Sequence, residues 1–462
     1  MTGREALRLV TWSAAALLVV FGVGLSLGAL AVAVGGRDVF TVGSASLGAD
    51  LPVPSVLDFF FDILTRVGWL LLPLAALWLV LRRLRRLALF ATIVGSGALA
   101  LTLGLGAVAR WGASLVALSD AAPSAESPIG EPGASVLVAT VTLGMLLLVF
   151  LPAMPVAGRV WAIVAAVMLN LAFLGVAFGR EPLSSLALAW AVAILWLALA
   201  TLVYVPLPGR RAQRRGLMAG LSPDERAQLH PAPEHDAPLS SSWRSAILLA
   251  GAFVVIGAAI VASGLLITGP LDGVRRFDTA VVEWFAGIRT PQLTDIAHAV
   301  DPLGNTPGII MVLLTAVTLV SALTRRWAPA AFLLAATIGE TAMFLSSQAL
   351  VGRARPSVEH LTDLPATESF PSGHVAASVA TYGAIALLLR VWAGKPAGWT
   401  GMGVAVSIVL AVALTRLYVG MHYPTDTVFG VVLGAAWLAA CWGAFRPDRG
   451  APFGIPDKAA DR

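Results

Sequence analysis

Three short clusters near the end of the chain contain the residue types that cleavage of a phosphate ester needs. In chain order they are Arg355-Pro356, then Pro371-Ser372-Gly373-His374, and then Arg416 with His422 and Asp426. Arginines can hold phosphoryl oxygens, one histidine can attack phosphorus, a second can give a proton, and a carboxylate can orient the attacker. The combination predicts phosphoryl transfer through a phosphohistidine.

Two histidines and one aspartate receive the covalent and proton-transfer roles. His422 is the expected nucleophile, because a neutral imidazole is a good nucleophile near neutral pH. Asp426 follows it by four residues, one helical turn, and should hold the other ring nitrogen and fix the tautomer. His374 should protonate the leaving oxygen and then activate water for the second step.

Four further residues are expected to bind the phosphoryl group. Arg355 and Arg416 offer planar forks to its oxygens. Ser372 and Gly373 should lie at a helix N-terminus, where free amides and the helix dipole favour an anion. In phosphoryl transfer, positioning and charge neutralisation supply most of the rate, so these binders belong to the catalytic machinery.

Each motif alone is a weak signal, since His-x3-Asp occurs often by chance and Pro-Ser-Gly is usually just a turn. Their order, and their expected meeting on one face, make the set specific. The single cysteine, Cys441, excludes an intramolecular disulfide, and no Cys/His cluster has the spacing of a zinc site.

The composition indicates a membrane protein. The chain is 58% hydrophobic and 12% charged, with a mean hydropathy of +0.84, far outside the range of soluble globular proteins. A net charge of +5 would suggest nucleic acid in a soluble protein. Here the basic residues cluster between apolar runs, so membrane topology explains them and no nucleic acid is expected.

Apolar runs of spanning length predict an all-α, polytopic fold with about twelve transmembrane helices in two six-helix halves. The first set lies near 9–34, 66–81, 87–109, 134–152, 160–178 and 183–206, and the second near 245–268, 306–324, 328–350, 373–390, 400–417 and 427–445. Residues 31–33 resemble a signal-peptide cleavage site, but the run from Val10 to Val34 is long enough to span a bilayer and is expected to be retained.

The basic loops predict the orientation. Most of the 31 lysines and arginines fall in segments that lie inside if both termini are cytoplasmic. In this topology the helices that end near Leu350 and Leu417 both exit outward, and the turn at Pro371 enters from the same side. All three clusters therefore meet at the extracytoplasmic surface of the cell membrane.

The domains are expected to be 1–206, a cytoplasmic linker at 207–243, a catalytic six-helix domain at 244–446 and a cytoplasmic tail at 447–462. Within the linker, Ser222 followed by proline and acidic residues should open one short helix.

The first half resembles a duplicate of the second. Each half has an entry helix and then an outer loop with an amphipathic stretch, Val56–Arg66 in one and Val274–Ala299 in the other. Pro132–Val136 corresponds in position to Pro371–Val375, and Gly175–Pro182 corresponds to Leu417–Pro424. The first half lacks the two histidines and the aspartate of the second. We expect a degenerate, catalytically silent copy; the alternative is chance likeness between apolar helices.

The second half, about residues 244–446, resembles the type 2 phosphatidic acid phosphatase family, which shares its site with the vanadium haloperoxidases. The family pattern is Lys-x6-Arg-Pro, Pro-Ser-Gly-His and Ser-Arg-x5-His-x3-Asp. This sequence reads Gln348-x6-Arg355-Pro356, Pro371-Ser372-Gly373-His374 and Thr415-Arg416-x5-His422-x3-Asp426. The resemblance implies a six-helix core and a reaction that needs no metal or other cofactor.

Two positions depart from the family pattern. Thr415 for Ser is mild, whereas Gln348 for Lys removes a point charge from the phosphate clamp. Arg353, two residues before Arg355 in an extended segment, should point to the same side and could compensate. Alternatively the substrate carries less charge, or turnover is slow.

Other polar residues have weaker claims. Glu340 lies in mid-span, which suggests either function or a hydrogen bond between helices. His360 and Glu368, in the loop between the first two motifs, are expected to be solvated, as are His298 and Asp301 in the outer amphipathic stretch.

The expected activity is removal of phosphate from a lipid phosphate or a polyprenyl diphosphate, such as undecaprenyl diphosphate, at the extracytoplasmic face. The substrate's chains would stay in the bilayer while its headgroup reaches the arginines. A lipid phosphotransferase, and a lipid-binding or transport protein with a decayed site, are the alternatives. The oligomeric state stays open.

Overall fold

The computed structural model describes residues 70–116, 132–151, 159–167, 183–204, 223–229, 239, 243–362 and 368–445. Every regular element in these ranges is a helix, as predicted. The chain divides into two compact units, Met1–His230 and Pro231–Arg462, and the boundary falls inside the predicted linker. The predicted tail at 447–462 lies outside the described residues.

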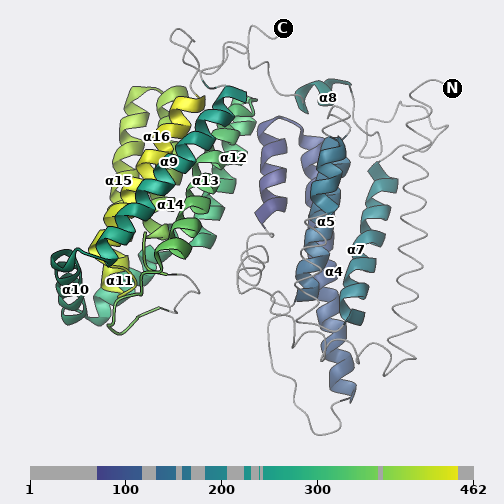
Figure 1. Cartoon of the computed structure of the whole chain (residues 1–462). Helices are drawn as coiled ribbons and strands as arrows, with labels where there is room; N and C mark the ends of the chain where they lie inside the picture. The colour runs from purple at the N-terminus through teal and green to yellow at the C-terminus, as the bar shows by residue number, and fades with distance from the viewer. Residues whose placement is uncertain are drawn as a thin grey trace. The chain divides into compact units, whose positions relative to one another are not determined.

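The first unit contains a helix at Leu70–Leu81, α4 (Arg85–Val116), α5 (Pro132–Phe150), a helix at 159–167, α7 (Leu183–Tyr204) and α8 (Pro223–Leu229) (Figure 1). Short helix α8 begins directly after Ser222, as expected. The Arg86 guanidinium pairs with the Glu225 carboxylate, and Leu229 is buried in the core of this unit. These contacts attach α8 to α4.

The prediction of twelve spans in two halves is met only in part. Among the described residues, seven helices are long and apolar enough to cross a membrane, and the chain is a multi-pass membrane protein. Only one of the seven, Arg85–Thr102, lies in the first unit. The predicted span at 9–34 and the segments 56–66 and 175–182 lie outside the described residues. The duplication therefore stays a prediction.

The second unit contains the six spans predicted for it, with ends shifted by a few residues. They are α9 (Trp243–Thr268), α12 (Thr306–Thr324), α13 (Ala328–Val351), α14 (Gly373–Trp392), α15 (Lys395–Tyr418) and α16 (Pro424–Phe445), and Figure 1 shows them as one bundle.

The predicted amphipathic stretch forms two short helices at one end of this bundle, α10 (Asp272–Gly287) and α11 (Pro291–Val300), followed by a 3-10 turn at Asp301–Leu303 (Figure 1). Thr290 caps α11 by accepting a hydrogen bond from the Leu293 amide at 3.3 Å. Helix α10 exposes Phe277 and Trp284 and contacts α9, α15 and α16.

Two glycines on α16 bring its backbone close to α14. A Cβ at Gly430 would lie 2.7 Å from the Ser372 carbonyl oxygen, and one at Gly434 would lie 2.6 Å from that of Ala376. Small residues four positions apart are how helices in a membrane approach closely. This approach brings the first turns of α14 and α16, which carry His374 and Asp426, next to each other.

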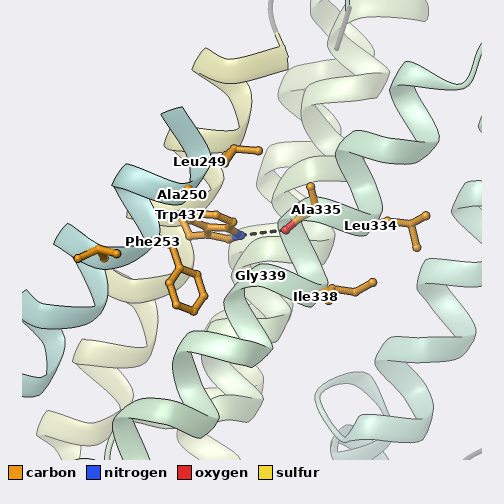
Figure 2. A pocket seen from close by; sticks show the side chains of 9 residues that line it. Leu249, Ala250, Phe253, Leu334, Ala335, Ile338, Gly339 and Trp437 are labelled. Atoms are coloured by element: carbon orange, nitrogen blue, oxygen red, sulfur yellow. Dashed lines mark hydrogen bonds between the residues drawn. The ribbon is translucent and has the colours of Figure 1, made fainter. Parts of the chain in front are cut away.

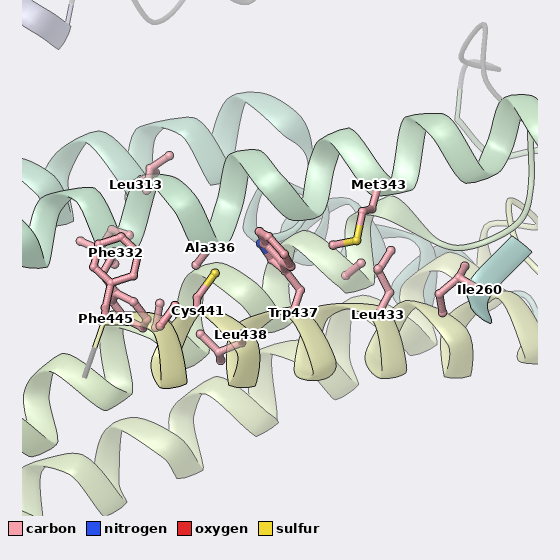
Figure 3. Close-up of a cluster of buried hydrophobic side chains, with 14 of the residues drawn as sticks. Ile260, Leu313, Phe332, Ala336, Met343, Leu433, Trp437, Leu438, Cys441 and Phe445 are labelled. Atoms are coloured by element: carbon pink, nitrogen blue, oxygen red, sulfur yellow. The ribbon is translucent and has the colours of Figure 1, made fainter. Parts of the chain in front are cut away.

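The core of the second unit is apolar and well packed. Its largest buried side chains come mainly from α13 and α16 and include Phe332, Met343, Leu433, Trp437 and Phe445 (Figure 3). The rings of Phe332 and Phe445 meet edge to face with centroids 5.9 Å apart.

An apolar groove of about 570 Å³ lies between α9, α13 and α16 (Figure 2). The Trp437 indole on its wall donates a hydrogen bond to the Ala335 carbonyl oxygen at 3.0 Å. A Cβ at Gly339 would lie 2.3 Å from this ring, so the glycine makes room for it. None of the lining residues belongs to the predicted site.

Candidate active site

The three sequence clusters meet where four helices begin or end, at the C-terminal ends of α13 and α15 and the N-terminal ends of α14 and α16. Gly352, at φ +61°, ends α13, and Gly420, at φ +80°, turns the chain after α15. Arg416 Nη1 lies 3.3 Å from His374 Nε2, and the rings of His374 and His422 have centroids 6.5 Å apart. The clusters therefore form one constellation.

His422 is buried, and its hydrogen bond defines the tautomer. Nδ1 lies 2.8 Å from the Ser369 carbonyl oxygen and 3.6 Å from Asp426 Oδ2. A carbonyl oxygen only accepts, so Nδ1 carries the proton and Nε2 keeps its lone pair. Asp426 was expected to hold this nitrogen; in the structure the closer acceptor is the Ser369 carbonyl, and Asp426 is the second group beside it.

Burial lowers the pKa of the His422 imidazole below its ordinary value, because desolvation disfavours the charged ring. Asp426 opposes this effect, while the cations Arg355 and Arg416 add to it. The ring is therefore neutral near neutral pH, as a nucleophile must be.

The Asp426 carboxylate is held from several sides. It accepts hydrogen bonds from the Tyr423 amide at 2.8 Å, from the Ser369 hydroxyl, and from Arg353 Nη1 at 2.5 Å. The bond to Tyr423 reaches back to the residue before α16, as an acid in a helix capping box does. These contacts fix the carboxylate beside His422.

Arg353 lies in a different environment from the one expected. Its Nη1 donates to Asp426 at 2.5 Å and its Nη2 to Asp278 at 2.7 Å, and its guanidinium lies 4.1 Å from the centroid of the Tyr423 ring. Only 6% of Arg353 is exposed. Both ends of the Arg353 fork are therefore occupied by carboxylates, whereas the prediction gave them to phosphoryl oxygens. The structure gives no support to the idea that it compensates for Gln348.

Arg416 pairs with Asp301, which was expected to be solvated. Its Nη2 donates to Asp301 Oδ1, and Asn305 Nδ2 donates to Asp301 Oδ2 at 2.9 Å. A guanidinium only donates, so His374 Nε2 accepts from Arg416 Nη1 in this arrangement. His374 is then ready to take a proton, which activation of water requires.

Arg355 and Gln348 both hold the chain just before the second motif. Gln348 Nε2 donates to the Glu368 carbonyl oxygen at 2.5 Å, and Arg355 Nη2 donates to the same oxygen at 3.1 Å. Arg355 Nη1 also reaches the Met421 carbonyl oxygen at 2.8 Å, next to His422. Gln348 therefore has a backbone partner where the family has a lysine.

Ser372 and Gly373 begin α14, as predicted. The Ser372 amide donates to the Asp426 carbonyl oxygen at 2.9 Å, while the buried Ser372 hydroxyl has no hydrogen-bond partner among the described residues. A Cβ at Gly373 would lie 2.5 Å from the Phe344 ring, so glycine lets the first turn of α14 pack on α13. The first amides of a helix have no intrahelical acceptor and suit an anion.

No sequence motif marks Asp278, Ser369 or Thr425, which complete the surroundings of Asp426 and His422. Thr425 precedes Asp426 and donates its hydroxyl to Asp278 at 2.5 Å. Ser369 acts partly through its carbonyl oxygen, for which a sequence carries no signal. Asp278 lies on the amphipathic helix α10, whose sequence pattern is typical of a solvent-exposed helix.

The remaining polar candidates stay outside this cluster of contacts. Glu340 is fully buried on α13, and its Oε2 accepts a 3.3 Å hydrogen bond from Thr341 on the same helix. Its Oε1 has no partner among the described residues. The described part of the chain contains no group of three His, Cys, Asp or Glu residues that could hold a metal ion.

Comparison with known proteins places this site in a family. Residues 326–449 match the model of the PAP2 superfamily. The chain is 38% identical over 89 residues to decaprenylphosphoryl-5-phosphoribose phosphatase from Mycobacterium tuberculosis, covering 19% of this chain and 44% of that protein. It is 37% identical over 101 residues to lipid A 1-phosphatase from Rhizobium johnstonii, covering 19% and 36%.

An undecaprenyl-diphosphatase from Sulfolobus acidocaldarius is 30% identical over 108 residues, covering 23% of this chain and 48% of that protein. The chain thus spans less than half the length of these relatives. A PAP2-type phosphatidylglycerolphosphate phosphatase from Bacillus subtilis aligns with a TM-score of 0.36 and 21% identity, over 44% of this chain and 96% of that one. The matched segment lies wholly in the second unit and gives no support to a second copy in the first. Residues 326–449 are a PAP2 superfamily membrane phosphatase domain.

Proposed function

We propose that this protein is a membrane lipid phosphatase that removes phosphate from a lipid phosphate or a polyprenyl diphosphate through a phosphohistidine at His422. The main support is the environment of His422. Its Nδ1 is tied to a carbonyl oxygen, its ring faces His374 across 6.5 Å, and Arg355 and Arg416 approach from neighbouring segments.

The reaction has two steps. In the first, the Nε2 lone pair of His422 forms a bond to phosphorus, the bond to the leaving oxygen breaks, and His374, protonated when the anionic substrate binds, gives that oxygen its proton. In the second, His374 takes a proton from water, whose oxygen attacks phosphorus and releases phosphate and free His422. Arg355, Arg416 and the amides at the start of α14 stabilise the charge on the phosphoryl oxygens in both steps.

A lipid substrate is supported by the membrane spans and by the relatives. The three relatives are all phosphatases, of decaprenylphosphoryl-5-phosphoribose, lipid A and undecaprenyl diphosphate. The three motifs do not separate these classes. A polyprenyl lipid is our first choice, because two of the three relatives act on polyprenyl lipids, one of them on a diphosphate.

The proposed topology has both termini in the cytoplasm and the site at the extracytoplasmic face of the cell membrane. It is supported by the distribution of the arginines along the sequence. Residues 244–446 would carry the activity, and residues 1–206 would be catalytically silent, with their role left open between support, recognition of a partner and lipid carriage.

The test is phosphate release by the purified full chain in detergent, without added metal, from a polyprenyl diphosphate, a phosphatidic acid and a soluble phosphomonoester. Wild type should release phosphate from a lipid substrate, and His422→Ala should not. His298→Ala is the matched control, because His298 is an exposed histidine of the same unit. Equal release by wild type and His422→Ala would exclude the assigned nucleophile. Phosphate that appears on a second lipid would indicate a phosphotransferase, and an inactive wild type would favour a decayed site.

A further inference from the structure

Asp278 is the one fully buried charged residue among the described residues of α10. Its carboxylate accepts from Arg353 Nη2 at 2.7 Å, from the Thr425 hydroxyl at 2.5 Å and from the Thr425 amide at 3.1 Å. A buried carboxylate is costly unless it is paired and hydrogen-bonded, and both of its oxygens are used here. Asp278 also lies outside the matched segment 326–449.

Arg353 connects Asp278 to the nucleophile. The same guanidinium holds Asp278 through Nη2 and Asp426 through Nη1, at 2.7 and 2.5 Å. Asp426 Oδ2 lies 3.6 Å from His422 Nδ1. Asp278, Arg353, Asp426 and His422 therefore form a continuous row of charged and polar groups that leads from α10 to the attacking ring.

The charges along this row suggest what Asp278 does. One cation is shared between two carboxylates, so the three groups together carry a net negative charge. Without the Asp278 charge, Arg353 and Asp426 would form a neutral pair. The ring of His422 becomes cationic when Nε2 is phosphorylated while Nδ1 keeps its proton, and a neutral pair would stabilise that cation less.

Asp278 also fixes the backbone that carries Asp426. The Thr425 amide is one of the first amides of α16, and these lack intrahelical acceptors. Asp278 supplies an acceptor from a distant part of the chain, so the turn that presents Asp426 is held in place.

We propose that Asp278 is a positioning residue for the nucleophile: acting through Arg353, it keeps Asp426 in place and negatively charged toward His422. The inference rests on the proposed phosphohistidine chemistry. It makes α10 a required part of a site whose motifs all lie further along the chain.

The experiment compares Asp278→Asn with Asp272→Asn in the full chain, because Asp272 is an exposed acid on the same helix, paired with Arg275. Asp278→Asn should lower kcat by roughly 10- to 100-fold, the scale expected for small misplacement of a reacting group, with KM changed less than about two-fold. Asp272→Asn should match wild type. A purely structural role would lower the yield and stability of the protein without changing kcat per folded molecule.

The pH profile gives a second readout. The charged and titratable groups around His422 are Asp426, Arg355, Arg416 and His374. Loss of a nearby negative charge disfavours the protonated ring, so the acid limb of kcat/KM should move to lower pH in Asp278→Asn. An unchanged kcat and an unchanged profile would overturn the inference.

Two further outcomes are distinguishable. If wild type is inactive, or if His422→Ala is as active as wild type, the proposed function fails, whatever Asp278 does. If Asp278→Asn does not fold, Arg353→Lys carries the test. A lysine keeps the positive charge but lacks the planar fork that bridges two carboxylates, so kcat should fall at constant KM. A kcat equal to that of wild type would overturn the inference.

Discussion

Two arginine–carboxylate clusters lie on either side of the histidine pair, and they differ in how firmly they are closed. Arg353 is bound between Asp278 and Asp426, whose side chains are 0% exposed. Arg416 pairs with Asp301, whose side chain is 24% exposed, and its Nε has no partner among the described residues. We propose that the first cluster is a fixed support behind His422, and that the second receives a phosphoryl oxygen beside His374 through this Nε of Arg416 while Asp301 orients the guanidinium.

Arginines that lie close together in one site can therefore have different kinds of partner. Arg353 and Arg355 are two residues apart in an extended segment, which suggests a shared task. In the structure Arg353 binds side-chain carboxylates, whereas Arg355 binds the backbone carbonyl oxygens of Met421 and Glu368. Burial lowers the pKa of the Arg355 guanidinium, yet an arginine stays cationic at any physiological pH.

Among the variants that distinguish the two arginine–carboxylate clusters, Arg416→Gln is expected to have the largest effect on activity. If Arg416 holds the phosphoryl oxygens, loss of its charge should reduce kcat by about 10²–10³-fold, as for loss of an oxyanion-binding donor. Steady-state phosphate release measures this loss. A decrease of less than about two-fold would show that the more open cluster does not bind the phosphate.

A smaller effect is expected from Asp301→Asn, which leaves Arg416 in place but weakens its partner. We expect kcat/KM to fall by roughly 10-fold, mainly through KM, because the guanidinium is less well oriented before the substrate binds. Measuring kcat and KM separately tests this. An effect on kcat alone would place Asp301 with the fixed support, beside Asp278.

The acid limb of the pH profile should lie at lower pH than for an ordinary histidine. Since burial lowers the pKa of His422 from its usual 6.5, the neutral nucleophile stays the major form as the pH falls through that value. A group of ordinary pKa would cost about ten-fold in kcat/KM one unit below it, and we expect a smaller loss. An acid limb centred above 6.5 would contradict the account of His422.

The smallest effect is expected from Gln348→Lys, which restores the family residue. A lysine can keep the hydrogen bond to the Glu368 carbonyl oxygen and add a positive charge near Arg355. We expect kcat/KM to rise by about two- to five-fold, the range of a weak charge contact. A decrease would show that the glutamine is adapted to the substrate of this protein.

Much of the second unit could be predicted from the sequence, because apolar runs of spanning length define its helices. The motif order defined the residues His374, Arg416 and His422, and helix ends brought them together. The sequence could not indicate which side chains pair when they lie far apart in the chain. Asp278 meets Arg353 across 75 residues and Asp301 meets Arg416 across 115, and no local pattern records such contacts.

The roles of acids were the least predictable part for a physical reason. An aspartate on an amphipathic helix is normally solvated, and only the packing of α10 and its neighbouring turn against the helix ends makes Asp278 and Asp301 partners of arginines. The four-residue spacing correctly placed Asp426 near His422. The spacing could not show that Asp426 Oδ2 lies 3.6 Å from His422 Nδ1 while the Ser369 carbonyl oxygen lies closer, at 2.8 Å. That arrangement depends on where the chain passes at Ser369.

The most direct test of the account is to trap the phosphoryl-enzyme. Wild type and His422→Ala would be mixed with a polyprenyl diphosphate labelled in its terminal phosphoryl group, quenched in alkali within one turnover, and digested for mass spectrometry. The account predicts an acid-labile phosphoryl group on His422 in wild type and none in the variant. Turnover of the lipid by wild type without a label on His422, or with the label on another residue, would contradict it.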